Sequence, residues 1–181
     1  MEKNKQIKEF AKSFLEIFVI IAFVVLIHTF VMEPVKVSGN SMYPTLHDKD
    51  LILIEKITTS QKKLERFDMI VFENKDDSEV HYVKRVIGLP GEKVQIQDGE
   101  IFVNDQKIED YYGYEDVLIN PGMAYDPVTL GPNQYFVLGD NRNHSSDSRF
   151  AEIGLVDQSQ INGKLFFRLA PFGDFGSLKN Q

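Results

Sequence analysis

A serine hydroxyl in a turn and a lysine amine in an apolar segment are the groups of this chain best suited to chemistry. Ser41 lies in the run Val-Ser-Gly-Asn-Ser-Met-Tyr-Pro-Thr-Leu at 37–46, and Lys84 lies in Tyr-Val-Lys-Arg-Val-Ile-Gly-Leu-Pro-Gly-Glu at 82–92. A serine hydroxyl is a weak nucleophile near neutral pH and needs a base within hydrogen-bonding reach. A lysine amine is such a base only when neutral, and burial lowers its pKa. The pair therefore indicates serine/lysine hydrolysis.

The neighbours of Lys84 predict the apolar setting that this chemistry needs. Alternation along a strand puts Tyr82, Lys84 and Val86 on one face. We therefore expect the amine to point into an apolar environment, while Arg85 points away.

Ser41 is predicted to lie on irregular, exposed backbone, because it stands between Gly39 and Pro44. Gly39 allows close approach of a substrate, and the amide of Ser41 is itself a candidate donor to an oxyanion. Met42 and Leu46 provide apolar wall nearby.

Each residue also has a purely structural interpretation. Ser41 fits an ordinary turn serine, and Lys84 fits an exposed edge strand, where lysine discourages aggregation. A further alternative is a triad of Ser41 with His144 and Asp147, three residues apart in a polar loop. The residue types alone leave these alternatives open.

Composition excludes several other classes of protein. The chain of 181 residues has a net charge of −7 without a long basic run, so nucleic acid is not an expected partner. It contains no cysteine, which removes disulfides and thiolate chemistry, and its four histidines show no metal-binding spacing. We expect no metal and no cofactor. A hydrophobic content of 43% favours a well-packed domain.

An almost wholly apolar stretch at 13–32 precedes the candidate nucleophile. As a helix it would be ~30 Å long at ~1.5 Å per residue, enough to cross a bilayer. Lysines are concentrated before the stretch, which predicts residues 1–12 in the cytoplasm and residues 33–181 outside. No small-x-small cleavage site follows the stretch, so we expect an uncleaved signal anchor in the cell membrane.

Beyond Pro34 the sequence predicts short strands separated by turns. Asp98-Gly99 between two alternating segments is a strong hairpin signal, and Asn104-Asp105 indicates a second tight turn. Residues 109–133 lack periodicity and are expected to form a loop or peripheral insertion. The predicted fold is mainly β, a partly barrel-like all-β domain after one membrane helix. The expected strands are 51–54, 69–72, 80–87, 94–97, 100–103, 134–138 and 164–169.

Four runs in this order resemble the conserved boxes of the type I signal peptidases, the membrane-bound serine/lysine endopeptidases of bacteria. They are the Ser41 and Lys84 runs, Arg-Phe-Asp-Met-Ile-Val-Phe at 66–72, and Gly-Asp-Asn-Arg-Asn-His-Ser-Ser-Asp-Ser-Arg at 139–149. The resemblance extends from the anchor to about residue 164, and the short chain with one anchor is similar to the compact Gram-positive type. It implies that Ser41 is the nucleophile and Lys84 the general base.

The resemblance also implies roles for the 139–149 run. Ser145 would help to orient the lysine amine, and Asp147 with Arg149 would form a supporting ion pair. The remaining polar residues, Asp140, Asn141 and Arg142, would hold the loop.

The sequence departs from the family pattern at a few positions. Some members carry a serine two residues before the nucleophile to complete the oxyanion hole, whereas this chain has Gly39 there and Ser38 one step earlier. A contribution from Ser38 is therefore open. Asn143 and His144 also replace residues that are often Asp and Asn.

By the same resemblance, the reaction is cleavage of exported preproteins after a small-x-small motif such as Ala-x-Ala. The signal peptide would lie as an extended strand between 35–38 and 81–84, near the outer face of the bilayer and the secretion translocon. Phe166 and Phe167 are expected in the core, while Phe172 and Phe175 fit either core or lipid contact. The residues expected to line the substrate pockets are Val35, Val37, Met42, Leu46, Tyr82 and Val83.

Two other functions remain to be distinguished. A soluble, self-cleaving repressor-type serine/lysine protease conflicts with the apolar anchor. An anchored accessory domain or inactive homologue would be expected to lack the nucleophile or the base, and both residues are present.

Overall fold

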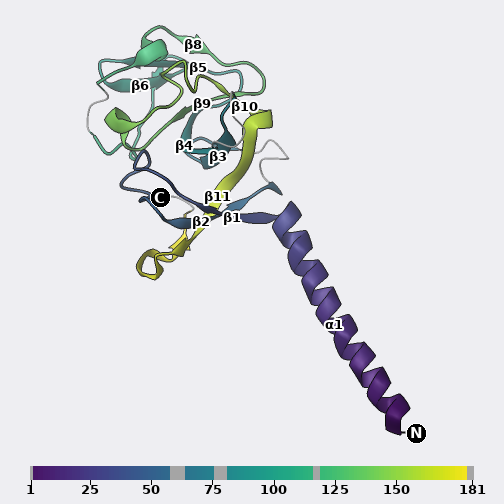
Figure 1. Cartoon of the computed structure of the whole chain (residues 1–181). Helices are drawn as coiled ribbons and strands as arrows, with labels where there is room; N and C mark the ends of the chain where they lie inside the picture. Colours follow the sequence, from purple (N-terminus) through teal and green to yellow (C-terminus); the bar gives the residue numbers. More distant parts are fainter. Residues whose placement is uncertain (1, 58–63, 76–80, 116–118, 179–181) are drawn as a thin grey trace.

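One long helix projects from a β-rich domain in the computed structural model (Figure 1). The helix, α1, spans Glu2–Phe30, and the strands of the domain begin directly after it. The structure describes residues 2–57, 64–75, 81–115 and 119–178, and within α1 it describes the side chains of residues 9, 10 and 12–26.

The helix α1 differs from the predicted membrane stretch at both ends. It already includes residues 2–12, and it ends at Phe30 because Met32 is the first residue of strand β1. Pro34 accounts for the early end, since proline lacks an N–H and disfavours helical backbone in the residue before it. Within the described residues, no helix reaches the combined length and hydropathy required of a membrane span.

The larger sheet is antiparallel and runs in the order β1-β2-β11-β3-β4-β9-β10, with β12 paired to β11. Strand β11 lies between β2 and β3, so it joins the β1–β2 pair, whose connecting turn contains Ser41, to the β3–β4 pair, whose second strand contains Lys84. The strands are β1 (Met32–Lys36), β2 (Leu51–Glu55), β3 (Met69–Glu73), β4 (His81–Gly88), β9 (Gln134–Leu138), β10 (Val156–Asp157), β11 (Ile161–Ala170) and β12 (Gly176–Ser177).

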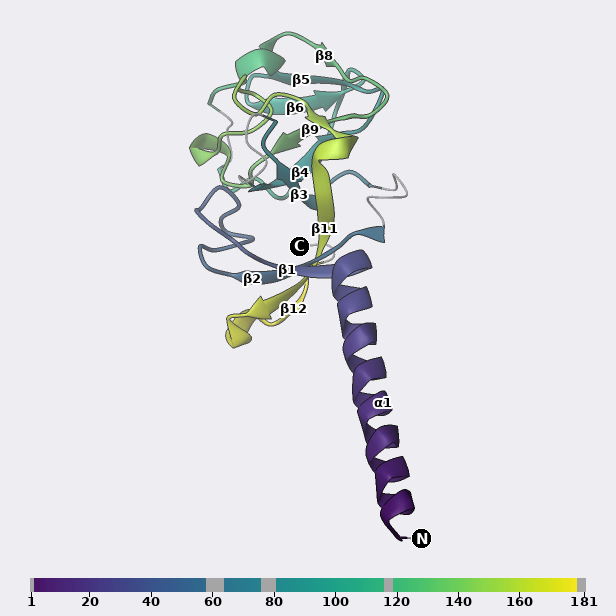
Figure 2. The ribbon, with the colours of Figure 1, turned by 45° about the vertical axis from the view of Figure 1, so that its right-hand side comes forward.

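The smaller sheet has four strands in the order β7-β6-β5-β8 and caps the end of the domain far from α1 (Figures 1 and 2). Asp98 and Gly99 join two of its strands with φ values of 52° and 81°, as a hairpin turn of this composition requires. Asn104 and Asp105 also have positive φ, which confirms the second predicted turn. The strands are β5 (Lys93–Gln97), β6 (Glu100–Val103), β7 (Gln106–Lys107) and β8 (Val128–Thr129).

The mainly β prediction is confirmed, and each predicted strand lies in an observed one, except that Val80 is outside the described residues. Closure into a barrel stays a prediction. Strand β1 was not predicted, and Pro34 is tolerated in it because the strand is at the edge of its sheet. The short strands β7, β8, β10 and β12 were not predicted either. Four 3₁₀ helices complete the described elements: η1 (Gly122–Tyr125), η2 (Arg142–His144), η3 (Gln158–Gln160) and η4 (Phe172–Asp174).

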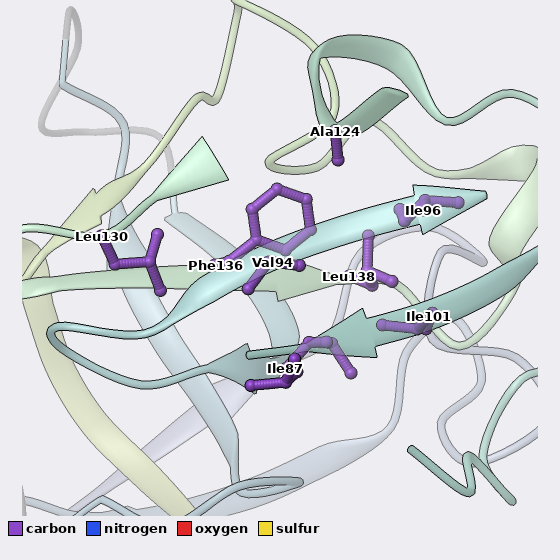
Figure 3. Packing of buried hydrophobic residues seen from close by; sticks show 9 residues of the cluster. Ile87, Val94, Ile96, Ile101, Ala124, Leu130, Phe136 and Leu138 are labelled. Carbon is purple, nitrogen blue, oxygen red and sulfur yellow. The ribbon is translucent and has the colours of Figure 1, made fainter. Parts of the chain in front are cut away.

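The smaller sheet packs on β4 and β9 through a wholly apolar cluster (Figure 3). Val94 and Ile96 from β5 meet Phe136 and Leu138 from β9, and all four are fully buried. Ala124 belongs to the same cluster, so the 109–133 segment is partly integral to the domain. A second cluster, which includes Met42, Leu46 and Ile54, lies behind the Ser41 turn.

Candidate active site

Ser41 lies in the turn between β1 and β2, and buried apolar side chains of the same turn anchor it to the domain. Met42 and Leu46 are buried, and Leu46 N donates a 2.8 Å hydrogen bond to Met42 O. Gly39 has a φ of 86°, a conformation that favours glycine, and its N–H donates to Asp48 Oδ1 at 2.9 Å. Ser41 itself is only half-buried.

Lys84 lies in β4 and is 2% exposed. It is in register with Ile70 of β3, whose side chain is fully buried. Burial lowers the pKa of Lys84 from 10.5 to about 8, against the opposing effect of the nearby carboxylates of Asp147 and Asp140. The amine is therefore buried, but the charged side chains of Asp147, Asp140 and Arg149 act on it, so its surroundings are not wholly apolar.

The fold brings these two residues into direct contact. Lys84 Nζ donates a 2.7 Å hydrogen bond to Ser41 Oγ, although the residues are 43 positions apart in the chain. A hydroxyl in contact with an amine of lowered pKa is the arrangement that activates a serine nucleophile.

Arg85 points away from this contact, as alternation predicts, but it is buried rather than exposed. Its guanidinium donates to both carboxylate oxygens of Asp140 at 2.8 and 2.6 Å. The ring of Tyr112 lies 3.8 Å from the guanidinium carbon. Adjacent residues of β4 thus place a buried amine on one face and a buried, fully paired cation on the other.

The loop of residues 139–149, here called the support loop, contacts the Ser41 turn through its backbone. Asn141 N donates to Ser41 O at 3.0 Å, and Asn141 Nδ2 donates to Asn40 O at 3.1 Å. A Cβ on Gly139 would lie 2.5 Å from Ser41 O and 2.3 Å from Ser145 Oγ, so only glycine fits there.

The support loop also contains the ion pair that the family resemblance implied. Arg149 Nε donates to Asp147 Oδ1 at 2.7 Å, and both side chains are buried. The other carboxylate oxygen of Asp147 accepts a 3.1 Å hydrogen bond from Gly139 N, which ties the pair to the backbone behind Ser41. Ser145 is also buried, and its hydroxyl donates to Ser146 O at 3.4 Å. Orientation of Lys84 by Ser145 stays a prediction.

The alternative triad is not favoured by this geometry. The side chain of His144 is 77% exposed, and its Nδ1 lies 3.4 Å from Glu115 Oε1. Asp147 is engaged by Arg149, and the Ser41 hydroxyl bonds to Lys84. In the described part of the chain, no group of three or more His, Asp or Glu side chains is arranged to bind a metal.

A cleft of about 80 Å³ borders the Ser41–Lys84 contact. Five of the six predicted pocket residues line it, whereas Leu46 is fully buried in the cluster beneath. Ser38 and Gly39 are also part of the wall, beside Ser41. The lining residues are Val35, Lys36, Val37, Ser38, Gly39, Ser41, Met42, Val71, His81, Tyr82, Val83 and Lys84.

Residues 109–115 and 119–125, here called the brace, make contacts with the support loop that were not predicted from the sequence. Asp110 forms an ion pair with Arg142, and Arg142 Nε donates to Gly139 O at 2.8 Å. Tyr114 N donates to Asp140 O at 2.8 Å, and the Tyr114 ring meets the Tyr43 ring edge to face at 4.9 Å.

The end of the brace holds the other side of the support loop. Arg149 Nη1 donates to Asn120 O at 3.0 Å, and Met123 N donates to Arg149 O at 2.8 Å. Ile119 N donates to Asn143 Oδ1 at 3.0 Å. These contacts join segments that show no common pattern in the sequence. The only feature of the sequence that pointed to them was the high density of tyrosine and acidic residues at 109–115.

The chain is similar to known proteins over nearly its whole length. Residues 8–170 match the family described as signal peptidase, peptidase S26. Signal peptidase I S of Bacillus subtilis (strain 168) is 35% identical, with 96% of this chain and 95% of that protein covered. Signal peptidase IB of Staphylococcus aureus (strain Mu50 / ATCC 700699) is 37% identical over 86% of this chain and 87% of that protein.

Among solved structures, the chain is similar to a signal peptidase I from Enterococcus faecalis V583, whose crystal structure has 31% sequence identity and a TM-score of 0.47. The matched region covers 57% of this chain and 97% of that chain. The family match and the Bacillus and Staphylococcus relatives lead to one conclusion. This chain belongs to the signal peptidase family, peptidase S26, as a serine-type peptidase of the Gram-positive type I kind.

Proposed function

We propose that this protein is a membrane-bound serine endopeptidase that removes N-terminal signal peptides from exported preproteins. Ser41 is the nucleophile and Lys84 the general base. The observation that carries the proposal is the 2.7 Å contact between the Ser41 hydroxyl and a buried amine whose pKa is lowered to about 8. The names of the similar proteins support the same substrate class.

The reaction follows from the two groups. Neutral Lys84 takes the proton of Ser41 as Oγ attacks the scissile carbonyl, and the resulting ammonium gives this proton to the leaving amine. Water then attacks the acyl-enzyme, with Lys84 again acting as base, and releases the carboxylate and free Ser41. The amide of Ser41 and the hydroxyl of Ser38 are the candidate donors to the oxyanion.

The strand order supports a direction for the bound signal peptide. The pairings β1–β2, β2–β11, β11–β3 and β3–β4 are all antiparallel, so β1 and β4 point the same way. Tyr82 to Lys84 pair with β3 on one side, whereas β9 begins to pair only at Arg85. A peptide that lies in the cleft between β1 and β4, parallel to both strands, would run from the α1 end of β1 towards Ser41.

The size of the cleft supports cleavage after small residues. A space of about 80 Å³ admits short side chains, and Val35, Val37, Met42, Tyr82 and Val83 provide apolar walls for it. An Ala-x-Ala-like motif places two such side chains on one face of an extended strand, because alternate residues point the same way.

The membrane attachment rests on α1 and the sequence around it. The described apolar side chains of this helix are exposed, from Phe10 to Leu26. Such a surface is stabilised by lipid rather than by water. We place the 13–32 stretch in the bilayer, residues 1–12 in the cytoplasm and residues 33–181 outside, where the cleft would meet preproteins as they leave the translocon.

The test is processing of a purified preprotein by the detergent-solubilised full chain. Ser41→Ala and Lys84→Ala should each abolish measurable cleavage, since removal of one catalytic group costs most of the rate enhancement. Ser146→Ala, in the exposed part of the support loop, and Lys93→Ala, on the smaller sheet, are the matched controls and should retain activity. Processing that persists in either of the first two variants would reject the assignment.

A further inference from the structure

Arg168 is a buried arginine of β11 that the reaction described above does not use. It is 6% exposed and lies opposite Ile52 of β2, and the register of this pairing shifts between Arg168 and Ala170. A buried guanidinium loses its hydration, so a buried position favours an apolar side chain unless the charge makes specific contacts. The charge at position 168 therefore points to contacts that an apolar side chain cannot make.

These contacts reach the turn that carries Ser41, residues 37–50, here called the nucleophile turn. Arg168 Nη2 donates a hydrogen bond to Thr45 O, and Arg168 Nε lies 3.2 Å from Asp50 Oδ2. A weaker contact, from Nη1 to Asp174 Oδ2 at 3.9 Å, lies near the surface. The guanidinium thus joins two separate points of the nucleophile turn to β11.

Asp50, the first of these points, closes the base of the nucleophile turn. It is 3% exposed, and its carbonyl accepts a 2.8 Å hydrogen bond from Val37 N. Its Oδ2 atom accepts a 3.1 Å hydrogen bond from His47 N. A buried carboxylate needs a partner of opposite charge, and Arg168 provides it. The geometry of the base therefore depends on the arginine.

Thr45, the second point, links the nucleophile turn to the strand that carries Lys84. Its carbonyl accepts from Arg168, and its hydroxyl accepts from Arg85 Nη2 at 3.5 Å. Arg85 is the neighbour of Lys84 on β4. Two buried arginines, one from β11 and one from β4, thus hold the same residue of the turn. Both restraints act on the position of Ser41 relative to Lys84.

We propose that Arg168 is a positioning residue, which fixes the nucleophile turn so that the Ser41 hydroxyl meets the Lys84 amine. This inference rests on the proposed function, because that reaction needs the contact. Arg168 acts through Thr45 and Asp50 rather than on the substrate. A displacement of about 1 Å between reacting groups can lower a rate by about a hundredfold, so a restraint on the turn contributes to catalysis.

The test measures kcat and KM of the detergent-solubilised full chain with a purified preprotein. Arg168→Met alone would leave the buried Asp50 carboxylate unpaired, so the variant to use is Arg168→Met with Asp50→Asn. It removes the donor to Thr45 O without leaving a lone charge. We expect kcat to fall by about tenfold to a hundredfold. KM should stay near that of the parent chain, because β1 and β4 still form the walls of the cleft.

Two further variants show whether the loss of kcat is specific to this restraint. Arg168→Lys keeps a charge for Asp50 and a donor group, so its kcat should lie between those of the double variant and the parent chain. Lys164→Met is the matched control, since it also removes a cation from β11, but one that pairs with Asp68 at 2.6 Å. It should keep the kcat of the parent chain. An equal loss in Lys164→Met would contradict the proposal.

Hydrogen exchange tests the restraint without reference to activity. The amide of Leu46, which bonds to Met42 O, should exchange faster in the double variant than in the parent chain or in Lys164→Met. Unchanged exchange at this amide, a parental kcat in the double variant, or a change in KM alone would each overturn the role of Arg168. A parent chain that cleaves no preprotein would instead reject the proposed function, while the exchange of Leu46 would still decide whether Arg168 holds the turn.

Discussion

The smaller sheet and the active site bury side chains to a similar degree, with opposite effects on stability. Val94, Ile96 and Phe136 are fully buried among other apolar groups (Figure 3), and each contributes about 1.5–3 kcal/mol of favourable transfer free energy. Lys84, 2% exposed, loses hydration of its amine when the chain folds, which lowers its pKa to about 8. The smaller sheet therefore stabilises the domain. Burial of the Lys84 amine is unfavourable, and the stability of the rest of the domain offsets it.

Replacement of the Lys84 amine should show the difference between the active site and the smaller sheet most clearly, because it should change activity and stability in different ways. Lys84→Met keeps the volume and apolar stem of the side chain but removes the proposed base, so we expect the cleavage rate to fall by about 10³-fold. The free energy of unfolding at pH 7 should stay equal or rise, because no amine has to be desolvated. Rates and denaturant unfolding in detergent measure both quantities.

Lys93→Met is the matched control for this change, since Lys93 lies on β5 and pairs with Asp105 at the surface. It should leave both activity and stability nearly unchanged. A Lys84→Met protein that loses stability but keeps its activity would contradict the assigned role.

A cavity in the smaller sheet should have the reverse effect. Ile96→Ala removes a fully buried side chain of the apolar cluster and should lower the free energy of unfolding by about 2–5 kcal/mol. The kcat of the protein that remains folded should not change, because the cluster lies on the other side of β4 and β9 from Ser41. A proportional loss of kcat would show that the two regions are coupled.

The pH dependence should reveal the buried amine in both activity and stability. Below the Lys84 pKa of about 8 the amine is charged, so the cleavage rate should fall about tenfold for each pH unit of acidification. In the unfolded chain the pKa is near 10.5, so this state binds more protons than the folded state between about pH 8 and 10.5.

The contribution of Lys84 to stability therefore increases as the pH rises through this window, by up to about 3 kcal/mol. Urea unfolding of the parent chain and of Lys84→Met across the window measures the difference. Equal slopes for the two proteins would show that the amine is not desolvated in the folded state.

Of the four predictions, a substitution in the brace should have the smallest effect. Asp110→Asn removes the charge that pairs with Arg142, and we expect about a tenfold loss of activity at pH 7, the scale of one buried charged hydrogen bond. A loosened support loop would admit water to Lys84 and raise its pKa, so the acidic limb of the rate profile should move to higher pH. Glu109→Gln, one residue away and bonded to the exposed Tyr111, is the control and should keep the parent profile. A lower rate with an unshifted limb would indicate only a structural role for Asp110.

Local sequence determined the elements whose structure depends on neighbouring residues. Asp98-Gly99 and Asn104-Asp105 predicted the turns because few other residues adopt positive φ without strain. Apolar runs predicted the central strands, and alternation predicted the opposite directions of Lys84 and Arg85. The strand β1 was missed because Pro34 argues against a strand unless its place at the edge of the sheet is known.

Residue types and a family resemblance were sufficient to single out Ser41 and Lys84, but only the tertiary structure decided how they meet. The 2.7 Å contact requires β11 to lie between β2 and β3, and these pairings join residues at least 89 positions apart, which no local pattern encodes. The burial of Arg85 against Asp140 and the brace behind the support loop are likewise long-range contacts. Short-range periodicity records which face of an element is apolar, whereas the partner that covers this face is selected by packing of the whole domain.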